Sequence, residues 1–321
     1  MLNSEPNRND IIQAHERIKG QIHKTPLFTS DSLNRITGCQ IYFKCENFQK
    51  VGAFKFRGAS NAIISLDKKE LEKGVITHSS GNHAAALALA ARMLNTPAYI
   101  VMPVTAPEIK KKAVAGYGAK ITFSEPTVKA REEAAGKIVD ETGATFIHPY
   151  DNYSIIAGQA TCAKEILEEV NDLDYIISPV GGGGLVSGTC LAARYFSNGT
   201  KIIGAEPEGA DDAFRSLRDK TIYPSVKPDT ICDGLLTQLC DKTYKILEKN
   251  IDSIITVGDN FTIEAMKLIW ERMKIIVEPS GAITLGAVLF NQAFFRNKKI
   301  ALILSGGNVD LEKLPWNRKT Q

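Results

Sequence analysis

One lysine of the sequence has neighbours that could make its amine reactive. Lys55 lies between two phenylalanines in the stretch Gly52-Ala53-Phe54-Lys55-Phe56-Arg57-Gly58-Ala59. An apolar setting disfavours the charged ammonium and so frees the amine as a nucleophile. Lysines of this kind form Schiff bases with carbonyl compounds, including pyridoxal phosphate. The alternative is an ordinary surface lysine at the start of a helix, and this stretch alone does not decide between the two.

A run of four glycines offers a second kind of chemistry. Gly181 to Gly184 join an apolar run to a predicted helix, so consecutive backbone N–H groups could converge beside a helix N-terminus. This arrangement predicts a phosphate cradle. Neither GxxxxGK[ST] nor a strand-led GxGxxG with a downstream acidic residue occurs, which disfavours a nucleotide loop. A flexible turn is the other interpretation, although four glycines are conformationally costly unless the backbone requires them.

Two more polar segments follow predicted strands. Ser79-Ser80-Gly81-Asn82-His83 offers hydroxyls, an amide and helix-start N–H groups, which suit a carboxylate or the ring oxygen of a cofactor. A simple helix cap is the alternative. Ser305, in Ser305-Gly306-Gly307-Asn308, follows the last apolar run, and a serine at the carboxyl edge of a parallel sheet would point into a ligand crevice.

Apolar runs that alternate with helical patterns indicate the elements that hold these residues. The first series has predicted strands at 74–77, 98–102, 120–123 and 145–147 and predicted helices at 84–94, 110–117 and 129–142. The second has predicted helices at 158–170, 185–196, 261–273 and 280–290 and predicted strands at 175–180, 201–205, 254–257 and 299–304, with a loop-rich region at 206–240. Strands that alternate with helices predict parallel sheets with right-handed crossovers.

The two series predict an α/β fold of two parallel-sheet lobes. A large domain would comprise residues 1–73 and 151–321, and a small domain, 74–150, would be inserted into it. Lys55 precedes the insertion and the glycine run follows it. We therefore expect the active site between the lobes.

The composition argues against several classes of protein. The formal net charge of +3 is too small and too evenly spread for a nucleic-acid or membrane-surface protein. No apolar run reaches membrane-spanning length, and the polar start of the chain has no apolar signal segment. The six cysteines show no zinc-site spacing, which favours reduced thiols. We expect a soluble cytoplasmic protein with neither nucleic acid nor membrane as a partner.

Taken together, the motifs are specific. GAFKFRGA, SSGNHA, GGGGL and SGGNVD, in this order, resemble the fold-type II (tryptophan synthase beta-like) pyridoxal-phosphate enzymes, and more narrowly the serine racemase and serine/threonine dehydratase family. The similarity runs from about residue 10 to 312. It implies that Lys55 holds pyridoxal 5'-phosphate as a Schiff base. The other cofactor contacts that it implies are Phe54 at the ring, Asn82 at the ring hydroxyl, Gly181, Gly182, Gly183, Gly184 and Leu185 at the phosphate, and Ser305 at the pyridine nitrogen.

The resemblance also implies two catalytic residues. The family's racemases have a serine where this chain has Ser80, whereas its dehydratases commonly have alanine. Racemisation needs an acid/base group on each face of the substrate, so Lys55 and Ser80 would exchange the proton from opposite sides. Because the neutral hydroxyl of Ser305 cannot hold a proton on the pyridine nitrogen, proton exchange or loss of a β-hydroxyl fits better than transamination.

A metal site is implied at the start of the loop-rich region. Glu206, the backbone carbonyl of Ala210 and Asp212 match the family's divalent-cation site. These hard oxygen ligands suit Mg²⁺, with Ca²⁺ or Mn²⁺ as alternatives, in a structural role. Without the resemblance, the same residues would be interpreted as an acidic, solvated loop.

The substrate is less closely defined. The predicted substrate contacts are Ser79, Ser80, Asn82, His83 and Arg131, although Arg131 could equally be a surface charge. Tyr150 departs from the asparagine of animal serine racemases, and the run of serines typical of aspartate-racemising relatives is absent after His148.

The resulting prediction is a homodimeric enzyme that interconverts L- and D-serine and dehydrates serine to pyruvate and ammonia. A threo-3-hydroxyaspartate ammonia-lyase with little racemase activity is the alternative among enzymes. From another class, the alternative is a catalytically silent binder of pyridoxal phosphate or amino acids.

Overall fold

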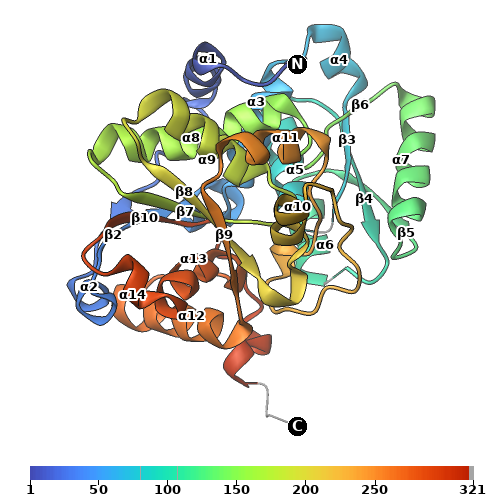
Figure 1. The fold of residues 1–321 in the computed structure, drawn as a ribbon. Coiled ribbons are helices and arrows are strands. Elements are labelled where there is room, and N and C mark those ends of the chain that lie inside the picture. The colour runs from blue at the N-terminus through green and yellow to red at the C-terminus, as the bar shows by residue number, and fades with distance from the viewer. Residues whose placement is uncertain (80, 107, 318–321) are drawn as a thin grey trace.

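A computed structural model describes residues 1–79, 81–106 and 108–317, and it contains two β-sheets (Figure 1). The larger sheet has the strand order β1-β2-β10-β7-β8-β9, and the smaller has the order β5-β4-β3-β6. The larger sheet consists of β1 (Leu27–Phe28), β2 (Gln40–Cys45), β7 (Tyr175–Pro179), β8 (Lys201–Pro207), β9 (Ser253–Val257) and β10 (Lys299–Leu304). The smaller consists of β3 (Val75–His78), β4 (Ala98–Pro103), β5 (Lys120–Ser124) and β6 (Thr145–Phe146). All pairings are parallel except that of β1 with β2. The predicted α/β class with two parallel-sheet lobes is confirmed.

Strand β10 lies at the centre of the larger sheet. It pairs with β2 on one side, with Ile300 opposite Ile41, and with β7 on the other, with Ala301 opposite Ile176. Its residues Ile300 to Leu304 are all buried, as expected for a parallel strand that is covered on both faces. The end of this strand, where Ser305 follows, is therefore held in the middle of the lobe.

Helices cover both faces of the larger sheet (Figure 1). One face packs against α1 (Arg8–Ile18), α8 (Tyr153–Glu169), α9 (Gly184–Phe196) and α11 (Asp241–Asn250). The other face packs against α2 (Asp31–Thr37), α12 (Asp259–Met273), α13 (Pro279–Phe290) and α14 (Gln292–Phe295). Two separate hydrophobic clusters result, one on each side of the sheet.

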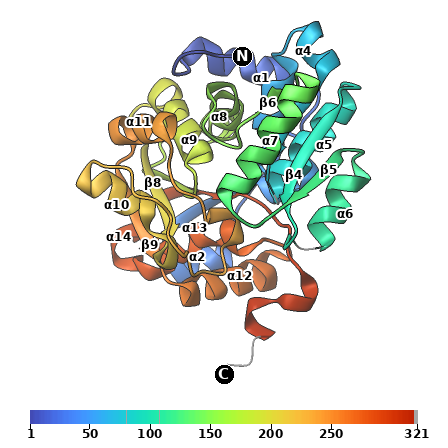
Figure 2. The same ribbon diagram turned by 90° about the vertical axis from the view of Figure 1, so that its right-hand side faces the viewer.

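The smaller sheet lies beside the larger one (Figure 2). The helices that pack against it are α5 (Asn82–Met93), α6 (Glu108–Gly116) and α7 (Val128–Thr142). Helix α3 (Lys55–Ile64), which α4 (Lys68–Lys73) follows, shares a buried cluster with this lobe through Phe56 and Ile63. Helix α3 also packs against α8 of the larger lobe. It is thus in contact with both lobes, and the domain boundaries at 73/74 and 150/151 remain predictions.

Several helices differ from the sequence-based expectation. The region 206–240 contains α10 (Asp212–Asp219), and α11 follows it, although both begin with charged residues rather than an apolar pattern. Helix α8 begins at Tyr153 instead of 158, because the Asn152 side chain accepts hydrogen bonds from the N–H groups of Ser154 and Ile155. This cap stabilises a first turn whose residues have no helical pattern of their own.

Two further predictions concern reduced cysteines and the absence of membrane-spanning segments. All six cysteines have free thiols, and only Cys240 is half-buried while the others are buried. Among the described helices, none has the length and apolarity needed to span a bilayer.

Candidate active site

A cavity of about 430 Å³ brings the predicted residues together. Part of its lining comes from the β3–α5 loop, the β7–α9 loop and the end of β10, which are the carboxyl ends of strands in both sheets. The start of α3 also contributes to the lining. The predicted residues that line it are Phe54, Lys55, Ser79, Asn82, His83, Arg131, Gly181, Gly182, Gly183, Gly184, Leu185 and Ser305. Ser80 lies outside the described residues. Glu206, Ala210 and Asp212 do not line the cavity: Glu206 lies near the end of β8, Ala210 in the short turn that follows, and Asp212 at the start of the next helix, α10.

Lys55 is the first residue of α3, and its side chain lines the cavity. The Phe54 N–H donates to the Ser305 carbonyl at 3.0 Å, so the start of the helix is attached to the end of β10. Lys55 Nζ donates to the Pro149 carbonyl at 3.2 Å and lies 5.1 Å from the centroid of the Phe54 ring. Burial lowers the pKa of the Lys55 ammonium to about 8. A useful share of the amine is therefore neutral, and nucleophilic, near neutral pH.

We expect the reactivity of Lys55 to follow this lowered pKa. Reductive alkylation of the cofactor-free protein with a small aldehyde should modify Lys55 with a midpoint near pH 8, because only the neutral amine attacks a carbonyl carbon. Peptide mass spectrometry across a pH series would measure the midpoint. The exposed Lys68 serves as the internal control for the reactivity of a surface lysine at each pH. Identical midpoints for the two lysines would contradict the description of Lys55.

The glycine run forms a tight connection between β7 and α9. Gly183 has φ of 87°, in the left-handed region that favours glycine. A Cβ at Gly182 would lie 2.4 Å from a carbon of the Tyr150 ring, so a side chain has no room there. In the described part of the chain, no side chain caps the N-terminus of α9. These uncapped N–H groups beside the cavity suit a phosphate.

Asn82 and Ser305 lie at the meeting point of the two lobes. Asn82 Nδ2 donates to Glu278 Oε1 at 2.9 Å, and Asn82 Oδ1 accepts from Asn308 Nδ2 at 3.0 Å. The Ser305 hydroxyl is nearly fully buried and donates to the Ser280 carbonyl at 3.3 Å. Both side chains are held by neighbours and are therefore pre-positioned.

Glu278 was not predicted from the sequence, although it lines the cavity. Its carboxylate also accepts the Asn308 backbone N–H at 3.1 Å, and burial raises its pKa to about 8. A Cβ at Gly306 would lie 2.4 Å from Glu278 Oε1, so the loop after β10 approaches this carboxylate closely. The only local signal was an acidic residue immediately before Pro279, which is also typical of an ordinary helix start.

Aromatic residues and Arg131 contribute to the small-lobe wall of the cavity. The ring centroids of His148 and Tyr150 lie 4.7 Å apart, and His148 Nδ1 accepts the Asp151 N–H at 2.8 Å. Burial lowers the pKa of His148 to about 4, so its imidazole is neutral. The pKa of His78 is lowered by burial and, to a lesser extent, by the charge of Arg131. Arg131 therefore lies at the cavity, where its charge affects neighbouring groups.

The predicted metal ligands lie around the start of α10. The two carboxylate oxygens of Glu206 accept N–H groups from Ala213 and Phe214, each at 2.7 Å. Asp212 Oδ2 is buried without a hydrogen-bond partner in the described chain. A buried, unpartnered carboxylate oxygen is costly, and a cation would satisfy it. The described residues hold no cluster of three His, Cys, Asp or Glu side chains suited to a metal, so carbonyl and water ligands would be needed.

Comparison with known proteins gives consistent results. Residues 18–306 match the family model described as pyridoxal-phosphate dependent enzyme. The chain is 49% identical over 312 residues to a beta-hydroxyaspartate dehydratase of Paracoccus denitrificans, covering 97% of this chain and 99% of that protein. It is 49% identical over 311 residues to a serine racemase of Dictyostelium discoideum, covering 95% of each. The crystal structure of a Dictyostelium discoideum serine racemase is similar with a TM-score of 0.91 at 48% identity, covering 95% of this chain and 99% of that one.

Proposed function

The chain belongs to the pyridoxal-phosphate dependent enzymes, and we propose that within this family it acts on serine. It would interconvert L- and D-serine and eliminate water from serine to give pyruvate and ammonia. The observation that carries this proposal is the 49% identity to a serine racemase along almost the whole of both chains.

The cavity suits the cofactor of this family. The neutral amine of Lys55 would bind its aldehyde, and the uncapped start of α9 with its packed glycines would bind its phosphate. Phe54 would lie against the ring, Asn82 would contact its hydroxyl, and Ser305 would contact its nitrogen. When bound, pyridoxal phosphate withdraws electrons from the substrate and makes the proton on its Cα acidic.

The residues of the chain would then control where protons go. Lys55 Nζ would remove and return the Cα proton on one face of the substrate, and Ser80 Oγ would do so on the other. The O–H of Ser305, which donates to the Ser280 carbonyl in the structure, would turn to donate to the ring nitrogen. Because this hydroxyl carries no charge, it would leave the ring nitrogen unprotonated. The two lobes would shield these transfers from bulk water, since both contribute to the cavity wall.

A second candidate function is the elimination of water from 3-hydroxyaspartate, with little racemisation. It is supported by the identity to a beta-hydroxyaspartate dehydratase and by Arg131. This arginine lines the cavity, and its Nε–H donates only a long hydrogen bond of 3.4 Å, to the Thr127 carbonyl. The guanidinium would thus have donors for the second carboxylate of such a substrate.

Product analysis separates the two functions. The cofactor-loaded protein is incubated with L-serine and, separately, with threo-3-hydroxyaspartate, and both chiral amino acids and keto acids are quantified. D-serine together with pyruvate from L-serine supports the first function. Turnover of hydroxyaspartate alone, with serine unchanged, would overturn it in favour of the second.

We also propose a divalent cation, Mg²⁺ with Ca²⁺ or Mn²⁺ as alternatives, at Glu206, Asp212 and the Ala210 carbonyl. The support is the unpartnered buried oxygen of Asp212. Addition of Mg²⁺ at about 100 times its Kd should raise the free energy of unfolding by about 2.7 kcal/mol, because the ion binds only the folded state. Thermal unfolding with and without chelator measures the effect. Asp212→Asn should remove the gain, whereas Asp219→Asn, at the other end of α10, should keep it. An unchanged melting curve in the parent protein would exclude the site.

The expected homodimer and cytoplasmic location belong to the same proposal. The homodimer is supported by the family resemblance alone, and the cytoplasmic location by the six free thiols. Light scattering of the purified protein would test the dimer, which should have twice the 35.1 kDa mass of the chain.

A further inference from the structure

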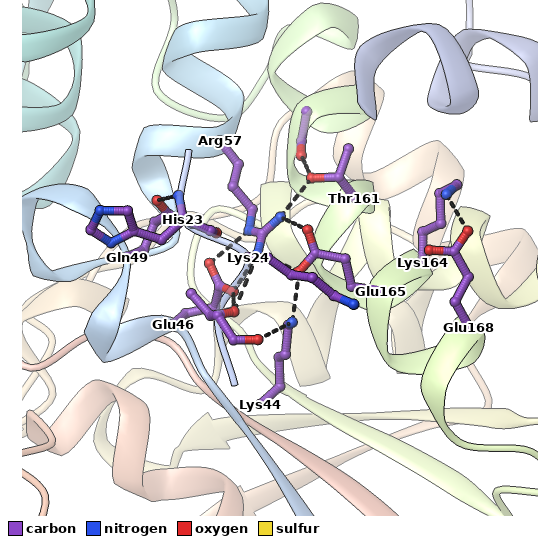
Figure 3. A network of polar contacts seen from close by, with 12 residues as sticks. His23, Lys24, Lys44, Glu46, Gln49, Arg57, Thr161, Lys164, Glu165 and Glu168 are labelled. Carbon is purple, nitrogen blue, oxygen red and sulfur yellow. Dashed lines mark hydrogen bonds and ion pairs between the residues drawn. The ribbon is translucent and has the colours of Figure 1, made fainter. Parts of the chain in front are cut away.

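Four buried charged side chains, Lys44, Glu46, Arg57 and Glu165, form a network of polar contacts (Figure 3). Arg57 is at their centre. Its Nε and Nη2 donate to the two carboxylate oxygens of Glu46, each at 2.8 Å. Its Nη1 and Nη2 donate to the two oxygens of Glu165, at 2.7 and 2.8 Å. Lys44 Nζ completes the group with a bond of 2.6 Å to Glu165. We call these four residues the Arg57 network.

Stability alone is a weak reason for such a network. Removing charges from water is costly, and apolar residues of similar volume often stabilise a protein as well or better. The charges of the four residues balance, with two positive and two negative, so the network adds no net charge near the cavity. What it does provide is geometry, because a guanidinium that binds two carboxylates through paired N–H groups has a fixed orientation.

The network connects three segments, of which α8 is remote in sequence from the other two. Glu46 directly follows β2 of the larger sheet, Glu165 is on α8, and Arg57 is in the first turn of α3. The carboxylate partners lie 11 and 108 residues from Arg57 along the chain. The first turn of α3 is thereby attached to both the sheet and α8.

The contact between α3 and α8 leaves no room for adjustment beside the network. A Cβ at Gly158 would lie 2.7 Å from the Gly58 Cα and 2.8 Å from the Arg57 carbonyl oxygen. The Gly58 N–H also donates to Gln159 Oε1 at 3.1 Å. The backbones set the distance between the two helices, and the guanidinium sets the rotation of α3 about its own axis.

Lys55 lies between two anchors. On its N-terminal side, the Phe54 N–H binds the Ser305 carbonyl, and Ala53 forms a bridge with Gly306. On its C-terminal side, the Arg57 network holds the same turn of helix. We propose that Arg57 is a positioning residue that fixes the first turn of α3 and so holds Lys55 Nζ where the cofactor aldehyde binds. This inference rests on the cofactor of the family and not on serine as the substrate.

The test measures attachment of the cofactor to Lys55, in which the amine binds the aldehyde carbon and one water leaves. Arg57→Lys keeps the charge but loses the paired donors, so it cannot hold both carboxylates in the same way. We expect pyridoxal phosphate to attach to the cofactor-free Arg57→Lys protein at least about 10-fold more slowly than to the parent, since small displacements of a reacting group have large effects on rate. Stopped-flow absorbance gives the rate, at a temperature where both proteins are fully folded.

Two further variants complete the experiment. Phe295→Leu alters a buried residue of α14, on the opposite face of the larger sheet, and should lower the melting temperature while keeping the parental rate (Figure 1). Glu165→Gln preserves the shape of a network residue but removes its charge, and it should slow cofactor attachment as Arg57→Lys does. If Arg57→Lys does not fold, the attachment rate of Glu165→Gln tests the inference in its place. Parental attachment rates in the folded network variants would overturn the inference. Attachment requires no amino acid, so this outcome is independent of whether serine proves to be the substrate.

Discussion

Replacing Lys55 by alanine is expected to abolish turnover of every amino acid, with a loss of at least about 10³-fold. The variant would lose the amine that we propose binds the cofactor and acts as a base. Among the side-chain hydrogen bonds of the described residues, no second lysine contacts the Pro149 carbonyl and could replace Lys55. The absorbance of the lysine-bound cofactor should disappear together with the activity. Both quantities are measured on protein that has been incubated with pyridoxal phosphate and desalted.

The matched control is Lys68→Ala, which removes an exposed lysine of the neighbouring helix α4. It should retain parental absorbance and turnover. Normal activity in Lys55→Ala would remove the assignment of the whole site. A silent binder of pyridoxal phosphate would instead show the cofactor absorbance in the parent protein and no turnover of any amino acid.

Replacing Ser80 by alanine is expected to separate the two proposed activities. Formation of D-serine from L-serine should fall by about 10²-fold or more, the usual contribution of one acid/base group, whereas pyruvate formation should persist. Elimination needs proton removal on the Lys55 face only, and racemisation needs proton transfer on both. Chiral chromatography and a keto-acid assay on the same samples give the two rates. Ser80 lies outside the described residues, so this expectation comes from its place in SSGNHA.

Ser79→Ala is the comparison for this variant. Ser79 lines the cavity, and its hydroxyl accepts the Gly81 N–H at 3.3 Å, so its loss should affect both products in similar proportion. An equal loss of D-serine and pyruvate in Ser80→Ala would leave Ser80 with a binding role only. It would also favour the lyase as the main activity of the protein.

The parts of the site that the sequence could predict are those with a local signal. The strand at 299–304 was predicted with the bounds that the structure shows, because a run of apolar residues ends there at Ser305-Gly306-Gly307. The glycine run was expected after a strand and before a helix, and it lies between β7 and α9. Residues predicted from four separate segments line one cavity, since parallel sheets collect the ends of their strands at one edge.

The parts that escaped prediction depend on contacts between distant residues. Glu278 resembles an ordinary residue at a helix start, and only the fold brings it against Asn82, 196 residues away. The Arg57 network was not predicted for the same reason, because Glu165 lies 108 residues from Arg57 in the sequence. Helices α10 and α11 were not predicted, because both begin with charged residues. Packing, and not an apolar pattern in the sequence, determines where they begin.

The position of β10 has a consequence for how the protein is made. Strands β2 and β7 do not pair with each other, because β10 lies between them. The ribosome must therefore synthesise the chain through residue 304 before the larger sheet can close, whereas all four strands of the smaller sheet are present by residue 146. Until then, the nascent chain exposes two unpaired strand edges of the kind that promote aggregation. The interval between the synthesis of β7 and that of β10 is thus the period in which the dependence of this protein on chaperones should be greatest.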